Sequence, residues 1–200
     1  MISIAVFASG SGSNFQAIYD ATQSGRLQAQ VSLLVCDKPD AKVIERAEKA
    51  GVQTFVFSPK DFASKEEYET EIYKQLSQQN VEFIVLAGYM RLIGSVLLEK
   101  FKGKIVNIHP SLLPSFPGKD AIGQAVKAGV KVTGVTIHYV DAGMDTGPII
   151  AQQAIEIGKG YTRETIEQRI HQVEHAIYAE TLQQLFQQIK KAGNSLIKTF

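Results

Sequence analysis

Short apolar runs that alternate with amphipathic segments are the feature that most limits the fold of this 200-residue chain. The runs, among them ISIAVFA and VSLLVCD, are rich in β-branched residues, and a helical pattern follows most of them. The predicted strands cover residues 2–8, 31–37, 52–57, 82–88, 105–109, 132–140 and 148–157. The predicted helices cover approximately residues 15–24, 40–50, 64–79, 119–128 and 162–191. This alternation predicts an α/β protein in which helices cover both faces of one sheet.

Composition is typical of a water-soluble globular protein of one domain. The chain is 44% hydrophobic and 20% charged, and its formal net charge of +1 gives no electrostatic case for binding nucleic acid or a membrane. No apolar run approaches the roughly 20 residues that a membrane helix needs. The chain has a single cysteine, Cys36, so it cannot form an internal disulfide. Its position in a predicted strand favours a buried thiol. The first residues lack the basic region of an export signal, so we expect a cytoplasmic protein.

Two polar residues, Asn107 and His109, stand in an otherwise apolar predicted strand. Alternate residues of a strand point to the same face, which places the two side chains roughly 6–7 Å apart along it. An amide N–H can hold a developing oxyanion and an imidazole can move a proton, so the pair suits acyl transfer. Hydrogen bonds of two strand-end polar residues to a neighbouring loop are the simpler alternative on this motif alone. The SLLPSFPG segment that follows is stiffened by proline, and Leu113–Pro114 is a candidate cis peptide.

A glycine-rich loop, residues 10–14, follows the first predicted strand and opens a helix. Its glycines let an anion approach the free N–H groups at the helix start, and Asn14 is a suitable N-cap. Phe15 stands where a dinucleotide fingerprint has its third glycine, although Asp37 could mimic the ribose-binding acid of that motif. No lysine follows the glycines, which excludes a Walker loop. The loop predicts a phosphate monoester site, with a plain strand-to-helix turn as the alternative.

A second glycine-punctuated loop, YVDAGMDTGP, carries the carboxylates Asp141 and Asp145. Ligands of α/β sheets collect beyond the carboxyl ends of the strands, and we expect the loops of residues 10–14, 88–93 and 107–118 to converge there. One of the two aspartates could then pair with His109 and favour its imidazolium form, worth about 4 kcal/mol at 4 Å and an effective dielectric of 20. Ordinary turn aspartates are the alternative.

The segment HQVEH, residues 171–175, matches the H-x-x-E-H pattern of some zinc proteases. His171 and His175 are one helical turn apart, but the one acid or histidine that follows them, Glu180, is five residues past His175 and does not share their face of a helix. Apolar residues at helical spacing form a stripe beside them. We therefore expect no metal site here and keep Glu174 as a candidate substrate contact.

Taken in order, SGSGSN, AGYMRLI, NIHPSLLPSFPG, HYVDAGMDTGP and EHAIY resemble the phosphoribosylglycinamide formyltransferases of purine synthesis. The resemblance runs from Ile2 to about Leu185. It implies a three-layer α/β/α Rossmann-like formyltransferase fold with a mostly parallel, mixed seven-stranded sheet. It also implies a single domain over residues 1–200, with the phosphate loop in about 1–100 and the catalytic residues and much of the folate site in about 101–190.

The same resemblance implies roles for individual residues. Asn107 stabilises a tetrahedral intermediate, His109 transfers a proton, and Asp145 rather than Asp141 orients the histidine. Contacts to the ribonucleotide fall on Gly12, Ser13, Asn14 and Glu174. Contacts to the folate fall on Lys65, Met90, Arg91, Leu92, Ile93, Asn107, Val140, Asp141 and Asp145. Lys65 stands where some relatives have arginine, and it lacks the planar fork of that side chain. The residues at 118–120 also vary among relatives.

The implied reaction is direct formyl transfer from 10-formyltetrahydrofolate, as co-substrate and without a metal, to the amine of N1-(5-phospho-D-ribosyl)glycinamide. The products are the N2-formyl ribonucleotide and tetrahydrofolate, in de novo purine (IMP) biosynthesis. Partners are small molecules only, with no nucleic acid and no membrane, and the protein is a monomer or homodimer. The alternatives are a 10-formyltetrahydrofolate hydrolase, another formyl-folate transferase, and a non-catalytic nucleotide-binding module. The first two are expected to carry further domains.

Overall fold

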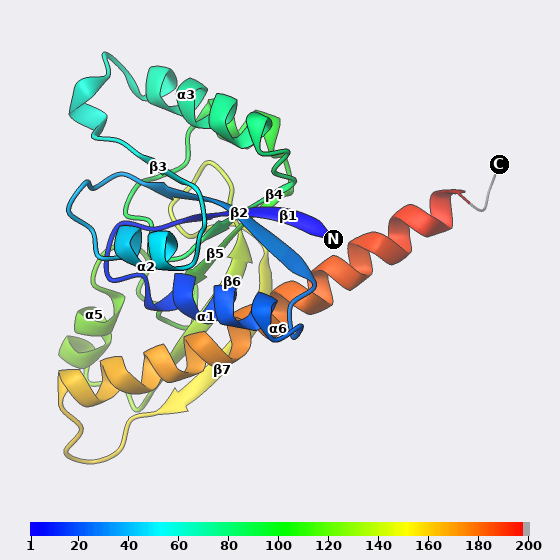
Figure 1. The fold of residues 1–200 in the computed structure, drawn as a ribbon. Coiled ribbons are helices and arrows are strands. Elements are labelled where there is room, and N and C mark those ends of the chain that lie inside the picture. Colours follow the sequence, from blue (N-terminus) through cyan, green and yellow to red (C-terminus); the bar gives the residue numbers. More distant parts are fainter. Residues whose placement is uncertain (198–200) are drawn as a thin grey trace.

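A computed structural model describes residues 1–197, and side chains to residue 192, as one sheet with helices on both faces (Figure 1). The strands are β1 (Ile2–Phe7), β2 (Ala29–Cys36), β3 (Thr54–Val56), β4 (Phe83–Leu86), β5 (Ile105–His109), β6 (Val132–Tyr139) and β7 (Ile149–Glu156). The helices are α1 (Ser13–Gln23), α2 (Val43–Lys49), α3 (Lys65–Gln78), α4 (Ser95–Lys100), α5 (Ala121–Ala128) and α6 (Arg163–Ile197), with a 3-10 turn η1 (Pro59–Asp61).

The sheet is mixed and mostly parallel, as predicted. Its strand order is β3-β2-β1-β4-β5-β6-β7. Strands β1 to β5 pair in parallel, whereas β6 runs antiparallel to β5, and β7 antiparallel to β6. The carboxyl ends of β1, β4 and β5 therefore lie at one edge, where the loops that follow them meet. The antiparallel register places His138 of β6 directly beside Asn107 of β5.

Apolar side chains of the central strands face a core on each side of the sheet. Along β1, Ile4 and Val6 pack with residues of α1 and α6, while Ala5 and Phe7 pack with residues of α3 and α4. Parallel strands covered on both faces need nearly continuous apolar runs. This requirement explains why β1 and β4 are almost entirely apolar.

Helix α6 is longer than predicted, and its last turns extend away from the rest of the molecule (Figure 1). The helix was predicted to end near residue 191, but residues 192–197 continue it because no proline interrupts AGNSLI. Residues 198–200 lie outside the described residues. Closer to its start the helix is anchored to the sheet, where the buried Tyr178 hydroxyl donates to the Leu86 carbonyl at 2.8 Å.

Two short elements, α4 and η1, were not predicted, because six and three residues are too few to show a helical period. Helix α4 begins after Gly94, whose N–H donates to the buried Glu69 carboxylate at 2.6 Å. Strand β3 is shorter than its predicted range. Among the described residues, no helix combines the length and apolarity needed to cross a membrane.

Candidate active site

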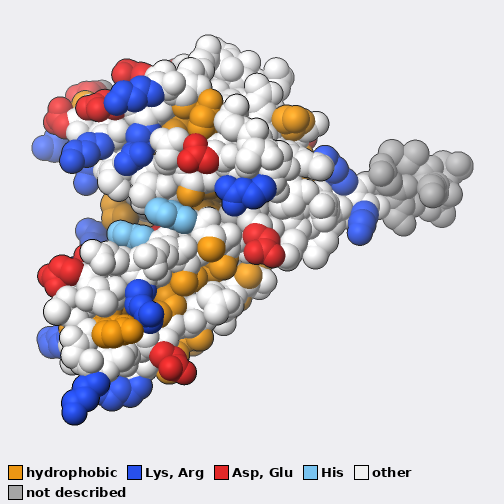
Figure 2. Space-filling model, turned by 60° about the horizontal axis from the view of Figure 1, so that its bottom comes forward, with side chains coloured by type: hydrophobic (Ala, Val, Ile, Leu, Met, Phe, Trp, Pro, Cys, Tyr) orange, Lys and Arg blue, Asp and Glu red, His pale blue; other side chains and the backbone are white. Residues whose placement is uncertain are grey.

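A cavity of about 590 Å³ lies where the loops after β1, β4 and β5 meet the β6–β7 loop and α6. Figure 2 shows a hollow in the surface with histidine side chains inside it. Every residue predicted for the site lines the cavity, apart from Lys65. The sequence therefore predicted both the convergence of the loops and most of the lining.

Lys65 is the first residue of α3, and its Nζ atom lies 4.0 Å from Glu69 Oε1. Because Glu69 also holds Gly94, the lysine stands beside the end of the 90–93 segment without lining the cavity. Its contact with folate remains a prediction.

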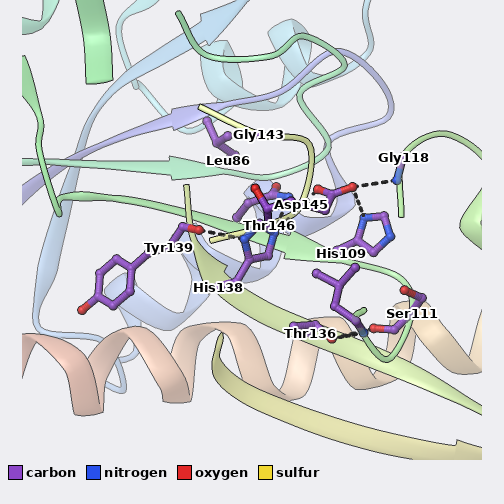
Figure 3. A network of polar contacts seen from close by, with 12 residues as sticks. Leu86, His109, Ser111, Gly118, Thr136, His138, Tyr139, Gly143, Asp145 and Thr146 are labelled. Carbon is purple, nitrogen blue, oxygen red and sulfur yellow. Dashed lines mark hydrogen bonds and ion pairs between the residues drawn. The ribbon is translucent and has the colours of Figure 1, made fainter. Parts of the chain in front are cut away.

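Asp145 lies between two histidines in the cavity (Figure 3). Its Oδ2 atom is 3.4 Å from His109 Nδ1, and its Oδ1 atom is 3.7 Å from His138 Nε2. The same Oδ2 accepts a hydrogen bond from the Gly118 N–H at 2.7 Å, which fixes the carboxylate. Between the two candidate aspartates, only Asp145 reaches His109. Asp141 instead accepts from the Gly143 N–H and the Thr146 hydroxyl of its own loop.

Both ring nitrogens of His109 face acceptors. Nε2 lies 2.9 Å from the Phe116 carbonyl oxygen, and Nδ1 faces the Asp145 carboxylate. A neutral imidazole has one N–H, whereas an imidazolium has two and satisfies both acceptors. The arrangement suits a protonated histidine, held by the stiff loop that the sequence predicted. The Leu113–Pro114 peptide in that loop is cis.

Asn107 is oriented by His138, a residue that sequence reasoning missed. The His138 Nδ1–H donates to the Tyr139 carbonyl at 2.8 Å, so its Nε2 accepts from the Asn107 amide at 3.2 Å. Burial lowers the pKa of His138, which favours this neutral form. The amide nitrogen has a second N–H, which remains for a ligand. The sequence held one sign that His138 belongs to the site, namely its position near the end of a predicted strand, just before the loop that carries Asp141 and Asp145.

The loop predicted to bind phosphate is built around Gly12, the N-cap of α1. Its φ of 75° is left-handed, and a Cβ atom there would lie 2.6 Å from Val43 Cγ2, so only glycine fits. Arg46 of α2 supports the loop through a 2.8 Å hydrogen bond from its Nε to the Ser11 carbonyl. The free N–H groups of the first turn and the nearby guanidinium favour an anion here.

Asn14 is not the N-cap that the sequence suggested, because Gly12 takes that position. It lies in the first turn of α1, where its buried Nδ2 donates to Glu174 Oε2 of α6 at 3.0 Å. Burial raises the pKa of Glu174, and the Asn14 hydrogen bond opposes that rise. Asn14 Oδ1 is buried and has no hydrogen-bond partner among the described residues. It is an acceptor at the edge of the cavity that a ligand hydroxyl or amine can satisfy.

Across the cavity, residues 90–93 form a largely apolar wall. Met90 and Leu92 are 58% and 49% exposed, an unusual exposure for such side chains that suits a flat apolar ligand. Arg91 is held away from them by Asp37, with Nε to Oδ2 at 2.7 Å. The other Asp37 oxygen accepts from the Ser9 hydroxyl. Asp37 is thus already paired with a cation and a hydroxyl, an arrangement that argues against its acting as a ribose-binding acid.

The two histidines of the HQVEH segment lie with ring centroids 6.4 Å apart on α6, and His171 lines the cavity. Among the described residues, no group of three or more His, Cys, Asp or Glu side chains could hold a metal ion.

Comparison with known proteins assigns the family. Residues 2–182 match the family model described as formyl transferase. The chain belongs to the formyl transferase family. It is 60% identical over 185 residues to the phosphoribosylglycinamide formyltransferase of Bacillus subtilis, covering 92% of this chain and 95% of that protein.

Solved structures and a distant relative agree. The crystal structure of glycinamide ribonucleotide transformylase 1 from Geobacillus kaustophilus superposes with a TM-score of 0.91 at 62% identity, covering 92% of this chain and 98% of that one. The human trifunctional purine biosynthetic protein adenosine-3 is 38% identical over 180 residues, which are 90% of this chain but only 18% of the human protein. The fold and the enzyme family are therefore those that the sequence motifs implied.

Proposed function

We propose that this enzyme transfers the formyl group of 10-formyltetrahydrofolate directly to the amine of phosphoribosylglycinamide, in purine biosynthesis. The observation that best supports this proposal is that Asn107, His109 and Asp145 line one cavity, between the predicted phosphate loop and an apolar wall. The cavity thus offers an anion site, a polar centre and an apolar site in one continuous space. The bacterial relative that matches over nearly its whole length bears the name of this activity.

The ribonucleotide occupies the end of the cavity near α1. Its phosphate meets the N–H groups of Gly12, Ser13 and Asn14. The Glu174 carboxylate and the unpartnered Asn14 Oδ1 are acceptors for the ribose hydroxyls or the glycinamide. This placement directs the reactive amine toward the polar centre.

The folate occupies the other end, with its pterin against Met90–Ile93 and the Val140–Asp145 loop. The exposed apolar side chains of the wall then become buried by the ring, which contributes about 25 cal/mol for each Å² of apolar surface removed from water. The formyl group at N10 comes to lie near Asn107 and His109. No metal takes part in the proposed reaction.

Chemistry begins when the amine attacks the formyl carbon. The free N–H of Asn107 and the protonated His109 stabilise the oxyanion, and Asp145 keeps the imidazolium charged and oriented. The oxyanion then collapses and the C–N bond to folate N10 breaks, as that nitrogen receives the proton that the attacking amine gives up, relayed through the site. For His109 Nε2 to serve the substrate, it has to release the Phe116 carbonyl, so the 110–118 loop shifts on binding.

The proposal includes the wider expectations drawn from the sequence. The chain acts as one formyltransferase domain, with the phosphate loop in residues 1–100 and the polar centre in residues 101–190. Its partners are small molecules, it is a monomer or homodimer, and it works in the cytoplasm. Hydrolysis of the formyl-folate is the second candidate, because the same polar centre could activate water.

Spectroscopic assay of folate release tests the proposal. Purified protein is mixed with 10-formyltetrahydrofolate with and without phosphoribosylglycinamide, and the deformylated folate is followed. Release that requires the ribonucleotide supports transfer. Release at the same rate without it supports hydrolysis, and no release in either mixture contradicts both candidates.

A further inference from the structure

A row of three residues crosses the antiparallel part of the sheet and begins at the proposed proton-transfer residue. His109 of β5 lies directly opposite Thr136 of β6, which lies directly opposite Gln152 of β7. Directly opposed residues of antiparallel strands project to the same face of the sheet. In the neighbouring row, His138 orients Asn107 in the same way, from the next strand. Neither Thr136 nor Gln152 lines the cavity, and the proposed reaction gives neither a role.

The buried hydroxyl of Thr136 uses all of its hydrogen-bonding capacity, and Figure 3 shows it beside Ser111. It donates to the Ser111 carbonyl at 2.7 Å and accepts from the Leu113 N–H and the Gln152 amide, each at 3.0 Å. A hydroxyl has one donor and two acceptor positions, so none is left. The same Gln152 nitrogen also donates to the Leu113 carbonyl at 2.9 Å. Two side chains of the row thus hold three backbone groups of the loop that follows His109.

The groups held in this way belong to residues 110–113, which follow His109 directly and which we call the anchored segment. Beyond it the chain turns back over the imidazole, where the Phe116 carbonyl oxygen lies 2.9 Å from His109 Nε2. The Ser111 hydroxyl joins the two parts, because it donates to the Ser115 carbonyl at 2.6 Å. In the proposed reaction Nε2 has to release Phe116. The later part of the loop therefore has to move while the part next to His109 stays in place.

We propose that Thr136 and Gln152 are positioning residues for formyl transfer, an inference that rests on the proposed function. By fixing the anchored segment to β6 and β7, they keep the His109 imidazole aligned with the substrates while residues 114–118 move. Neither side chain lines the cavity, so both act on the rate of the chemical step and not on substrate binding. A displacement of about 1 Å in a catalytic group can lower the rate about 100-fold, so a small loosening of the anchor has a large effect.

The test compares kcat and KM of variants of the full-length enzyme in steady-state formyl transfer, with each substrate varied in turn. Thr136→Val keeps the shape of the side chain and removes its hydroxyl. Its kcat should fall by about 10- to 100-fold, while both KM values stay within about threefold of the parent. Thr136→Ser restores the hydroxyl, and its kcat should return to within about threefold of the parent.

Gln152→Met removes the amide and keeps the length of the side chain. The fall in kcat should be smaller, about 3- to 10-fold, because Thr136 still holds the anchored segment. Both residues act on that one segment, so the double variant should lose little more than Thr136→Val alone. Gln153→Met is the matched control. This exposed neighbour in β7 donates, among the described residues, only to the Ala154 carbonyl, and its substitution should leave kcat within about twofold of the parent.

Stability is measured alongside activity. Thr136→Val leaves the Leu113 N–H without its partner, so its urea-denaturation midpoint should also fall, and kcat is expressed for the folded fraction. Gln152 lies on the edge strand and is exposed, so Gln152→Met decides the question if Thr136→Val does not fold. The nitrogen NMR signals of the His109 ring are recorded for the parent and the variants, and they require no turnover. They should shift in Thr136→Val or Gln152→Met and stay unchanged in Gln153→Met.

A folded Thr136→Val enzyme with kcat within threefold of the parent would overturn the proposal, and so would equal losses in Gln152→Met and Gln153→Met. A fall in kcat matched by a rise in both KM values would overturn it as well, because that pattern indicates a loosened site and not a misplaced imidazole. Failure of the proposed function has a different signature, since the parent enzyme itself would then transfer no formyl group. In that case unchanged signals of the His109 ring in the variants would still overturn the anchoring role.

Discussion

Replacing Asp145 with asparagine removes one negative charge beside His109 and keeps the shape of the side chain. At an effective dielectric of about 20, unit charges 3.4 Å apart attract by about 5 kcal/mol, an upper limit for what the carboxylate gives the imidazolium. The asparagine carbonyl can still accept from the Gly118 N–H, so the loop keeps its 2.7 Å hydrogen bond. If about 3 to 4 kcal/mol of that attraction is realised in the transition state, kcat falls by roughly 100- to 1,000-fold.

The assay is steady-state formyl transfer at saturating substrates, measured at several pH values. We expect the deficit of Asp145→Asn to appear in kcat, because the carboxylate stabilises the imidazolium in the transition state. Asp141→Asn is the comparison on the same loop, because among the described residues the Asp141 carboxylate accepts hydrogen bonds from Gly143 and Thr146 of that loop and from no other residue. A loss of kcat in Asp141→Asn as large as in Asp145→Asn, or an Asp145→Asn enzyme within threefold of the parent at every pH, would refute the reasoning.

Four further predictions concern other parts of the site. Asn107→Ala should lower kcat by about 100-fold or more, since an oxyanion donor is typically worth about 2.7 to 4 kcal/mol. A kcat close to that of the parent enzyme would show that Asn107 does not stabilise the oxyanion. Glu174→Gln should raise KM for the ribonucleotide more than KM for the folate, as measured by initial-rate kinetics with each substrate varied in turn. A larger rise in KM for the folate would contradict this placement of Glu174. Burial lowers the pKa of His138, so below about pH 6.5 the unfolded chain binds a proton that the folded chain does not. The free energy of unfolding, measured by urea denaturation, should therefore fall as the pH drops below about 6.5. The fall should be weaker in His138→Gln. Tyr178→Phe should lower the free energy of unfolding by about 1 to 3 kcal/mol, because the Leu86 carbonyl loses a buried donor, and an unchanged denaturation midpoint would contradict this.

Local sequence patterns were enough to predict most of the fold. The apolar runs located all seven strands, because each central strand is buried on both faces and tolerates few polar residues. The spacing of Asn107 and His109 placed both side chains on one face of a strand, and both line the cavity. Glycine and proline marked the loops that meet there. Short elements such as α4 were missed, since six residues do not display a helical period.

Contacts between distant segments could not be predicted from local patterns. His138 reaches Asn107 through the antiparallel register of β5 and β6, which no short window of sequence contains. Asn14 looked like a helix cap, but its amide meets Glu174, which is 160 residues away. Asp37 looked free to bind a ribose until the fold brought Arg91 against it. In each case tertiary packing set the partner of a polar group whose local role was plausible.

Tracing the formyl group itself tests the central claim most directly. Enzyme is mixed with 10-formyltetrahydrofolate labelled in the formyl carbon and with phosphoribosylglycinamide, and the label is quantified in the ribonucleotide and in free formate. Direct transfer predicts one labelled formyl group in the ribonucleotide for each tetrahydrofolate released, and little formate. Label recovered as formate while the ribonucleotide stays unlabelled would show that water is the acceptor, and would contradict the account.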